Sequence, residues 1–366
     1  MTKFLHCADI HLDSVFQALE GGRNDLRRAE LREVFSRIVS LAKTEKVDIV
    51  FISGDIFEGE NASAESIELI VSEFERASEV KFFISPGNHD PYSQGSQYTL
   101  MNLPPNAHIF RKPEIEKVSL EDLKLNVYGA AFVNKTCASS LLNGFVVEKS
   151  EFDSICIIHG DIFTPTGPYN SMSQSEIANS GFDYIALGHV HAGGEYKIGQ
   201  TLCVYPGAPE GRGFDELGDK GVILGRIENH KLDVEFRSTA YRKYLEQEID
   251  VTECETDVEV LEKARATAFE APLINLYKVI LTGEVKGLFD TQILYDAIAS
   301  DFFFLKIYDN TTQISDGLLN EESLKGIFVG VANKEIQVAT DENTRKILNL
   351  AKKFGTCALE RRQLKI

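Results

Sequence analysis

Short apolar runs alternate with amphipathic stretches along the first 240 residues of the chain. Each run is rich in Val, Ile and Phe, and each stops at a cluster of Gly, Asp, His or Asn residues. The runs cover 3–7, 48–52, 81–85, 124–129, 154–158, 184–187 and 201–205. Continuous apolar runs of this kind are typical of strands that are buried on both faces, so we expect a strand at each of them.

Helical spacing fills the early gaps between these strands. Apolar side chains recur at intervals of three or four residues in 26–45 and again in 64–79, and each set forms one stripe along a helix. The alternation of strands and helices predicts βαβ units and a largely parallel sheet. The segment 221–237 differs, because two apolar runs flank the polar residues 228–230, which predicts an antiparallel hairpin.

The polar clusters stop after about residue 240, and the pattern changes. Beyond that point strands are expected at 248–251, 276–285 and 302–308, and helices at 257–269, 291–300, 321–336 and 341–360. We therefore predict an α/β fold with two domains, a larger one over residues 1–240 and a smaller α+β one over 241–366. A chain of 366 residues is long enough for two domains of ordinary size.

Acidic residues dominate the charge of the chain. The 38 Lys and Arg residues face 56 Asp and Glu residues, which gives a net charge of −18. This balance argues against a general nucleic-acid coat, or an anionic membrane surface, as the main partner. It still permits a site at which metal ions or local arginines neutralise an anionic substrate.

Nothing in the sequence predicts an association with membranes. No apolar run approaches the roughly 18–20 residues that a membrane-spanning helix needs. His6 and Asp9 interrupt the N-terminal apolar stretch, which therefore lacks the core of a signal peptide. The cysteines are scattered, without a Cys-x-x-Cys pair, which predicts reduced and mostly buried thiols. We therefore expect a cytoplasmic protein.

Most of the potential metal ligands follow predicted strands. Seven of them lie at five strand ends: Asp9, His11, Asp55, Asn88, His159, His189 and His191. Ligands beyond the carboxyl ends of parallel strands fall where α/β sheets usually place their sites. Carboxylate, amide and imidazole groups without a thiolate suit Mn²⁺, Fe²⁺ or Zn²⁺ better than Ca²⁺ or a structural zinc site. Any one cluster is commonplace, but five in succession indicate a metal centre.

The same clusters resemble a known family. Asp9-x-His11, Gly54–Asp55, Gly87–Asn88–His89–Asp90, His159 and Gly188–His189-x-His191 match, in order, the motifs of calcineurin-like metallophosphoesterases. Segments 6–12 and 205–221 resemble DNA repair exonucleases of the SbcD type, and 210–218 is most similar to their YhaO-type branch. The resemblance covers about residues 3–222 and implies layered sheets flanked by helices. The region after 240 corresponds by position alone to the family's capping domain.

The resemblance also implies roles for individual residues. One metal would be held by Asp9, His11, Asp55 and His191, and the other by Asp55, Asn88, His159 and His189. Asp55 would bridge the two ions, which in this family are usually manganese. His89 would act as the catalytic general acid while hydroxide generated at the metals attacks phosphorus.

One position departs from the pattern of the family. Some of its nucleases carry a further histidine three residues after the bridging aspartate, where this chain has Glu58. A carboxylate does not stabilise a phosphate as an imidazolium does, so the balance of exonuclease and endonuclease activity is left open. Arg212, Arg27 and Arg28 are candidates for contacts with a DNA backbone, together with Arg23 and the basic C-terminal segment. A solvated helix face explains Arg27 and Arg28 equally well.

Three functions are compatible with these residues. The first is a two-metal DNA exonuclease that works with an ATPase partner of the SbcC type and forms a homodimer, as the resemblance implies. The second is a metallophosphoesterase for a small phosphodiester or phosphomonoester, which the acidic charge favours. The third is a non-enzymatic scaffold, which predicts missing ligands. Since all seven ligands and His89 are present, the scaffold is the least favoured.

Overall fold

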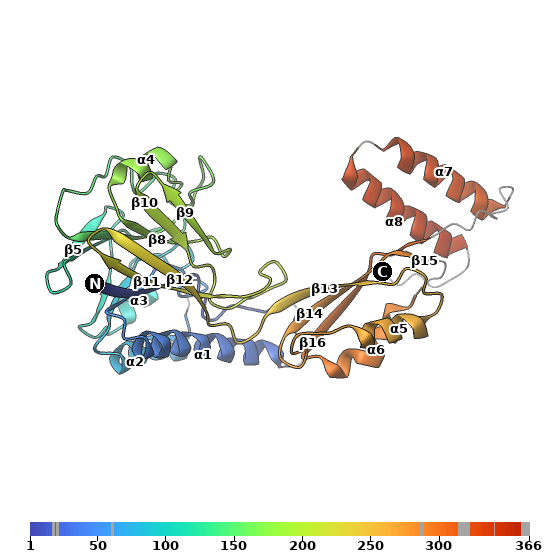
Figure 1. The fold of residues 1–366 in the computed structure, drawn as a ribbon, viewed down its shortest axis with the longest axis horizontal. Helices are drawn as coiled ribbons and strands as arrows, with labels where there is room; N and C mark the ends of the chain where they lie inside the picture. The colour runs from blue at the N-terminus through green and yellow to red at the C-terminus, as the bar shows by residue number, and fades with distance from the viewer. Residues whose placement is uncertain are drawn as a thin grey trace. The chain divides into compact units, whose positions relative to one another are not determined.

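The chain divides after Lys243 into two compact units, Met1–Lys243 and Tyr244–Ile366. The computed structural model describes residues 1–16, 19, 22–59, 62–285, 289–313, 323–339 and 341–359. Each unit has its own sheets and its own buried core, and each is described by itself (Figure 1).

The first unit contains two six-stranded sheets. One has the order β12-β11-β1-β2-β3-β4. Its strands are β1 (Thr2–Cys7), β2 (Ile49–Ile52), β3 (Lys81–Ile84), β4 (Ala107–Ile109), β11 (Gly221–Glu228) and β12 (Lys231–Ser238). β1 to β4 are parallel, whereas β11 and β12 add an antiparallel hairpin at one edge.

The other sheet has the order β5-β6-β7-β8-β10-β9. Its strands are β5 (Glu116–Leu120), β6 (Leu125–Gly129), β7 (Asp153–His159), β8 (Tyr184–Gly188), β9 (Gly194–Ile198) and β10 (Thr201–Tyr205). The four central strands are parallel, and β5 and β9 pair antiparallel at the two edges. In each sheet, the carboxyl ends of the parallel strands therefore lie on the same side.

The two sheets pack face to face, and helices cover their outer faces. Phe4 and Phe51 of the first sheet join Tyr184 of the second in one buried cluster. Figure 1 shows α1 (Arg23–Thr44) and α2 (Ala64–Arg76) along one side of this unit and α4 (Gln174–Ser180) on the opposite side. The short helix α3 (Gln97–Leu100) follows β3. This arrangement confirms the predicted layered sheets flanked by helices.

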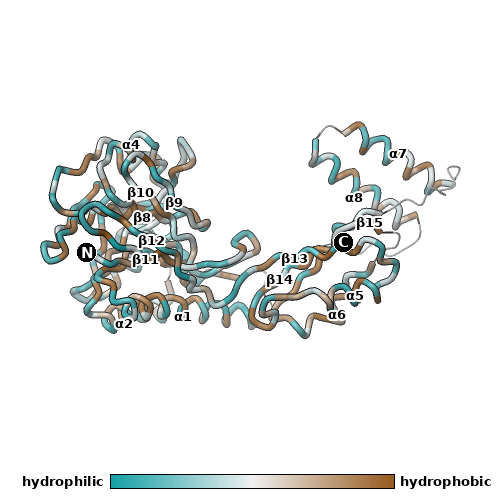
Figure 2. The backbone as a smooth tube through the Cα atoms, in the orientation of Figure 1, coloured by the Kyte–Doolittle hydropathy of each residue, from teal (hydrophilic) through white to brown (hydrophobic). Residues whose placement is uncertain are grey.

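Apolar patterning predicted the central elements better than the edges. All seven apolar runs, both early helices and the antiparallel hairpin are present. The patterning missed β4, β5 and β9, and it predicted one parallel sheet where two are found. β5 and β9 are edge strands whose residues alternate between partly buried and exposed, so neither forms a continuous apolar run. Figure 2 shows hydrophobic stretches along the strands and hydrophilic residues in many of the loops.

The second unit is built around a small parallel sheet with the order β13-β14-β16. The strands are β13 (Tyr244–Asp250), β14 (Leu276–Thr282) and β16 (Phe304–Asp309), joined by α5 (Asp257–Ala266) and α6 (Thr291–Ile298). β15 (Glu284–Val285) pairs with β17 (Thr312–Gln313), and the helices α7 (Leu324–Val338) and α8 (Glu342–Leu359) follow. β13 begins earlier than expected. The predicted residues 321, 322 and 360 and the basic residues after 360 lie outside the described residues.

Membrane-spanning helices and the state of the cysteines can also be compared with the expectations from the sequence. Within the described ranges, no helix combines the length and the hydropathy needed to cross a membrane. Five cysteines of the described part of the chain are free thiols, and all of them except Cys137 are buried.

Candidate metal centre

The predicted ligands come together at the carboxyl ends of parallel strands from both sheets. Asp9 and His11 follow β1, Asp55 follows β2 and Asn88 follows β3 in the first sheet. His159 ends β7, and His189 and His191 follow β8 in the second sheet. Because the sheets pack face to face, segments 180 residues apart meet: the His189 amide N–H donates to both carboxylate oxygens of Asp9 at 3.0 and 3.1 Å.

Several of these residues have a left-handed backbone. The φ angle is +53° at Asp9, +51° at His11, +53° at Asp55 and +104° at His189. Such conformations are uncommon outside glycine and cost about 1–3 kcal/mol each, and they cluster at functional sites. The surrounding packing therefore holds this set of side chains in conformations that local preference disfavours.

Glycines give the ligands room to approach one another. Gly54 has a φ angle of +89°, and a Cβ there would lie 2.5 Å from Nδ1 of His159. A Cβ on Gly87 would lie 2.2 Å from Oδ1 of Asp55. Side chains at either position would displace a predicted ligand, which gives the glycines of these motifs a physical role.

The inward-facing donor atoms form two groups. In the first group, donor atoms of Asp9, His11 and His191 all lie within 4.8 Å of one another. In the second, the same holds for Asp9, Asp55 and His159. Asn88 belongs beside the second group, because its Oδ1 lies 2.9 Å from His159 Nε2 and 3.2 Å from Nδ1 of His189. The structure thus brings all seven predicted ligands together.

Asp55 lies between the two groups. Its Oδ2 is 3.8 Å from His11 Nε2 in the first group and 3.4 Å from His159 Nε2 in the second. Its Oδ1 accepts the amide N–H of His89 at 2.9 Å. One carboxylate oxygen is thus held by the chain, while the other faces histidines of both donor groups.

The outward ring nitrogens have separate partners. Nδ1 of His11 lies 2.8 Å from Glu58, Nδ1 of His191 lies 2.7 Å from Glu216, and Nδ1 of His159 donates to the carbonyl of Ser53 at 2.8 Å. Each partner leaves Nε2 free to face the other donors, with His11 Nε2 only 3.2 Å from His191 Nε2. Orientation of imidazoles through the opposite nitrogen is characteristic of metal ligands. The donor set therefore fits two divalent cations.

Burial and ion pairing shift the pKa values of these groups in opposite directions. Burial opposes the charge on Asp55, but the adjacent His159 holds the pKa of Asp55 below its usual range. Burial likewise opposes protonation of His159, but Asp55 raises the pKa of His159 to about 9. Burial lowers the pKa values of His11 and His189. Burial also opposes protonation of His191, but the contact with Glu216 outweighs it and raises the pKa of His191. Neutral imidazoles are the form that binds metals, so a proton competes with a metal at His159 and at His191.

His89 lies beside the donor groups and remains accessible. Its side chain is 42% exposed, and its Nδ1 lies 3.2 Å from Oε1 of Glu58. The interaction with Glu58 raises the pKa of His89, which favours the protonated ring. His89 packs edge-on against the ring of His11, with 4.8 Å between the ring centroids. A proton donor is therefore available next to the first donor group.

Asp90 has a structural role. Its carboxylate accepts hydrogen bonds from the amides of Asp55, Ile56, Phe57 and Gly87 and from the hydroxyl of Tyr98. Burial and the nearby Asp55 raise the pKa of Asp90 to about 7. Asp90 thus holds the turn that presents Asp55, and the carboxylate that contacts His89 is Glu58.

The candidate arginines have different surroundings. The expectation that Arg27 contacts DNA, and the alternative of a solvated helix face, are both wrong in this structure. Arg27 is completely buried, where it forms ion pairs with Glu30 and Glu210.

The other candidate arginines are less buried. Arg28 is half-buried and donates to the main-chain carbonyl of Ser14, and Arg23 is exposed. Arg212 lies at the metal centre, where its guanidinium pairs with Glu58 and Glu216.

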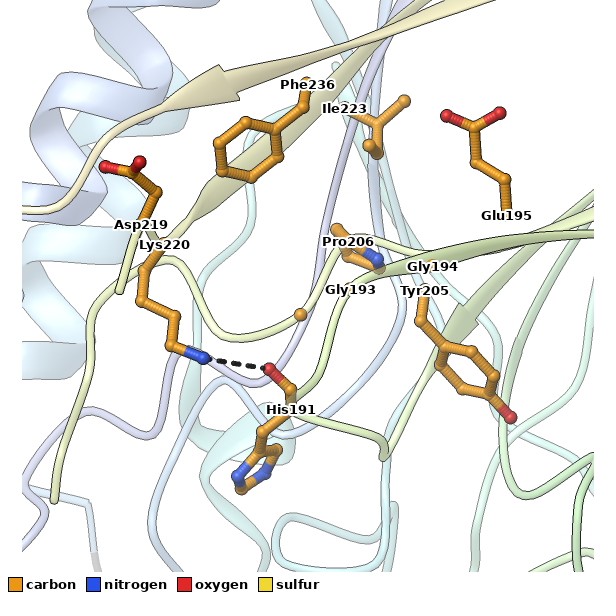
Figure 3. Close-up of a pocket in the computed structure, with 11 residues that line it drawn as sticks. His191, Gly193, Gly194, Glu195, Tyr205, Pro206, Asp219, Lys220, Ile223 and Phe236 are labelled. Carbon is orange, nitrogen blue, oxygen red and sulfur yellow. Dashed lines mark hydrogen bonds between the residues drawn. The ribbon is translucent and has the colours of Figure 1, made fainter. Parts of the chain in front are cut away.

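His191 is one of the residues that line a cavity of about 410 Å³. Figure 3 shows the ring of His191 turned away from Ile223 and Phe236, which line the cavity, while Lys220 extends toward the His191 carbonyl. Nζ of Lys220 donates to that carbonyl at 3.4 Å. Lys220 is buried, and its hydrogen bond restrains the main chain of the loop that carries His191.

Sequence reasoning missed two of the residues that orient the imidazoles. Ser53 acts through its main-chain carbonyl, for which no side-chain signal exists. Glu216 lies in the segment 210–218 that carried the resemblance, but only the fold brings it to His191. Glu58 was noted as a departure from the family without its contacts.

Comparisons with known proteins agree with this geometry. Residues 2–193 match the calcineurin-like phosphoesterase family, and the chain therefore belongs to that family. Calcineurin-like phosphoesterases use a dinuclear metal centre, and the donor groups described above provide candidate ligands for one.

Individual relatives are more distant. The uncharacterized metallophosphoesterase YhaO of Bacillus subtilis is 27% identical over 260 residues, which are 68% of this chain and 63% of that protein. The DNA double-strand break repair protein Mre11 of Sulfolobus acidocaldarius is 23% identical over 386 aligned positions, covering 96% of this chain and 98% of that protein. The SbcD component of the SbcCD nuclease of Bacillus subtilis is 23% identical over 59% of this chain and 63% of that component. The chain thus spans less than two thirds of the length of YhaO and of SbcD.

Proposed function

We propose that this protein is a two-metal phosphodiesterase and that its substrate is DNA, which it degrades as an exonuclease in repair. The observation that carries the proposal is the pair of donor groups that face a single carboxylate oxygen of Asp55. Two divalent cations held there would neutralise phosphate charge and activate a water for in-line attack on phosphorus. Asp9, His11, Asp55 and His191 would hold one cation, and Asp55, Asn88, His159 and His189 the other.

His89 has the position of a general acid. It lies next to the first donor group, it is 42% exposed, and Glu58 contacts its Nδ1. Donation of a proton to the departing alkoxide is worth about 10²–10⁴-fold in rate. A protonated His89 would serve this step without binding a metal itself.

The choice of DNA rests on similarity to proteins with that role. One relative is named as a DNA double-strand break repair protein and another as part of a nuclease. The net charge of −18 does not oppose this choice at the site, because two bound cations would reverse the local potential. We further propose that the cations are Mn²⁺, with Fe²⁺ or Zn²⁺ as alternatives, since the donor set lacks a thiolate.

The remaining proposals concern the organisation of the protein. We assign catalysis to residues 1–240 and a capping role to 241–366, with an ATPase of the SbcC type as partner and a homodimer as the assembly. Size-exclusion chromatography with light scattering tests the homodimer, and co-purification with an SbcC-type ATPase tests the partner.

A nuclease assay tests the activity. End-labelled duplex and single-stranded DNA would be incubated with Mn²⁺, with Mg²⁺ and with EDTA, and bis-p-nitrophenyl phosphate would be assayed in parallel. We expect Mn²⁺-dependent loss of label that EDTA abolishes. Cleavage of the small diester with intact DNA would favour the alternative, a phosphoesterase for small substrates, which the acidic composition supports. If the assay is repeated with the ATPase added and DNA stays intact, the nuclease proposal fails.

A further inference from the structure

A chain of ion pairs lies over the first donor group. Arg212 joins two carboxylates from separate segments: its Nη1 lies 2.7 Å from Oε2 of Glu58, and its Nη2 lies 3.3 Å from Oε1 of Glu216. The amide N–H of Arg212 also donates to Oε2 of Glu216 at 2.9 Å. Glu58 follows β2, whereas Arg212 and Glu216 lie between β10 and β11, so the pairs join two segments that are distant along the chain.

Each carboxylate of this chain of ion pairs also contacts a predicted ligand of the first cation. Oε2 of Glu58 lies 2.8 Å from Nδ1 of His11, and Oε1 of Glu216 lies 2.7 Å from Nδ1 of His191. These contacts use the ring nitrogens that face away from the other donors. A carboxylate at that nitrogen fixes the tautomer and the ring orientation, and it makes the opposite nitrogen a stronger donor.

The second donor group is oriented differently. Nδ1 of His159 donates to the main-chain carbonyl of Ser53, and its Nε2 faces Asn88. The carbonyl of Ser53 belongs to the backbone at the end of β2 and does not depend on a side chain. The two halves of the centre therefore differ in what holds their imidazoles.

Arg212 explains how two carboxylates are tolerated beside a site for an anionic substrate. The planar guanidinium provides several donors in a fixed fork, so one arginine can hold two carboxylates at a set separation. It also neutralises part of their charge, which would otherwise repel a phosphate. Ser14 adds a further restraint, because its hydroxyl donates to Oε2 of Glu58 at 3.0 Å.

We propose that Glu58, Arg212 and Glu216 form a clamp that orients His11 and His191 and thereby sets the affinity of the first cation position, independently of the second. The proposal rests on the proposed two-metal function. It gives Glu58 a positioning role. Some nucleases of the family carry a histidine at this position. It also assigns Arg212 to the clamp instead of to DNA contact.

Calorimetric titration of Mn²⁺ into metal-free protein tests the clamp directly. We expect the wild type to bind two equivalents. Glu58→Gln and Glu216→Gln should each weaken one equivalent by about 10–100-fold, the usual cost of losing an orienting partner, and leave the other unchanged. Asn88→Ala should weaken the opposite equivalent. Glu148→Gln, at an exposed glutamate outside the site, is the matched control and should bind both cations as the wild type does.

Arg212 provides a second and independent variant. Arg212→Met should weaken the same equivalent as the two glutamine variants, and Arg212→Lys should restore only part of the affinity, because a point charge cannot hold both carboxylates in a fixed geometry. Replacing the first cation by Co²⁺ gives a spectroscopic readout of His11 and His191 that does not depend on turnover. Thermal unfolding followed by circular dichroism checks the fold of each variant, and Glu216→Asp replaces Glu216→Gln if the latter unfolds.

The outcomes separate the clamp from the proposed function. If the wild type binds no cation in these titrations, the two-metal function itself is wrong. If the wild type binds two equivalents and cleaves phosphodiesters while folded clamp variants bind both as tightly as the wild type does, only the clamp is wrong. Equal weakening of both equivalents in every clamp variant would also overturn the independence of the two halves.

Discussion

The two units of this chain use the same architectural element with different results. Both contain parallel strands joined by helices, with β1, β2 and β3 in the first unit and β13, β14 and β16 in the second. All eight histidines of the sequence lie in the first unit. Every potential metal-binding group found within the described ranges of the chain also lies there.

The difference between the units begins directly after the strands. In the first unit β2 is followed by Gly54 and Asp55, both with positive φ, and Asp55 faces two donor groups. In the second unit β14 is followed by Gly283, also with positive φ, and β16 ends at Asp309, whose carboxylate accepts from Thr311. A parallel sheet thus provides a place for a site, while the residues beyond its strands decide whether chemistry occurs there.

The largest effect is expected from the same substitution at one strand end in each unit. Asp55→Asn should empty the metal centre, because the bridging oxygen loses its charge, and phosphodiesterase activity should fall by more than the roughly 10–100-fold that loss of an orienting partner costs. Asp309→Asn should change neither property. Elemental analysis and a diester assay measure both, and full occupancy in Asp55→Asn would contradict the bridging role.

His89→Ala should separate catalysis from metal binding. We expect turnover to fall by about 10²–10⁴-fold, the usual contribution of a general acid, while both cations remain bound. Steady-state kinetics and Mn²⁺ titration provide the two readouts, with His230→Asn as a control at a histidine remote from the ligands. Unchanged turnover in His89→Ala would exclude the acid role.

Glycine substitutions sharpen the comparison of the two units. Gly54→Ala and Gly283→Ala should each lower the free energy of unfolding by about 1–3 kcal/mol, because both positions have positive φ and little space for a Cβ. Only Gly54→Ala should also weaken Mn²⁺ binding, since its Cβ would meet His159 at 2.5 Å. Denaturant unfolding and Mn²⁺ titration test this. Equal loss of Mn²⁺ binding in both variants would indicate a general effect of stability.

The smallest effect concerns pH and a histidine outside the centre. A hydrogen bond to Asp183 raises the pKa of His230, and Asp153 lies 3.7 Å away. Because the folded pKa exceeds the unfolded value of about 6.5, this pair stabilises the fold below that pH, and the contribution is lost as pH rises through the folded pKa. His230 is 51% exposed, so solvent screening limits the contribution to about 0.5 kcal/mol.

His230→Asn measures that contribution. Asparagine tolerates the positive φ of this turn position, so the variant removes the titration with little backbone strain. The difference in unfolding free energy between wild type and variant should be larger at about pH 5.5 than at about pH 8.5. A difference of the same size at both values would show that the ion pair contributes nothing measurable.

Local patterns were sufficient for elements with a strong periodic signal. Residues 49–52 and 155–158 are continuous apolar runs, and the structure buries every residue of both, with alternate side chains in the cluster between the sheets. β9 could not be recognised in this way, because an edge strand exposes alternate residues and lacks a continuous run. Periodicity alone did not separate the two sheets, because a run of buried residues indicates a strand but not which sheet it joins; the layered sheets were expected from the family resemblance.

At the candidate site, too, local patterns predicted some features and missed others. Short motifs located all seven candidate ligands and His89, because each motif is confined to a few residues after a strand. The environment of Arg27 was misjudged, because Glu210, its partner, lies 183 residues away and no local pattern reports it. The carboxylates of Glu58 and Glu216 were equally invisible as orienting groups, since their targets belong to other segments.

The sequence by itself determined which residues are candidates for binding metal, where the strands that carry them end, and the family to which those motifs belong. Only the tertiary structure decided that Asp55 lies between two donor groups, that Arg27 is buried in ion pairs, and that Arg212 holds Glu58 and Glu216 against His11 and His191. The physical reason is range. Periodicity and turn chemistry act over a few residues, whereas hydrogen bonds and ion pairs at a site join atoms that are close in space and distant along the chain.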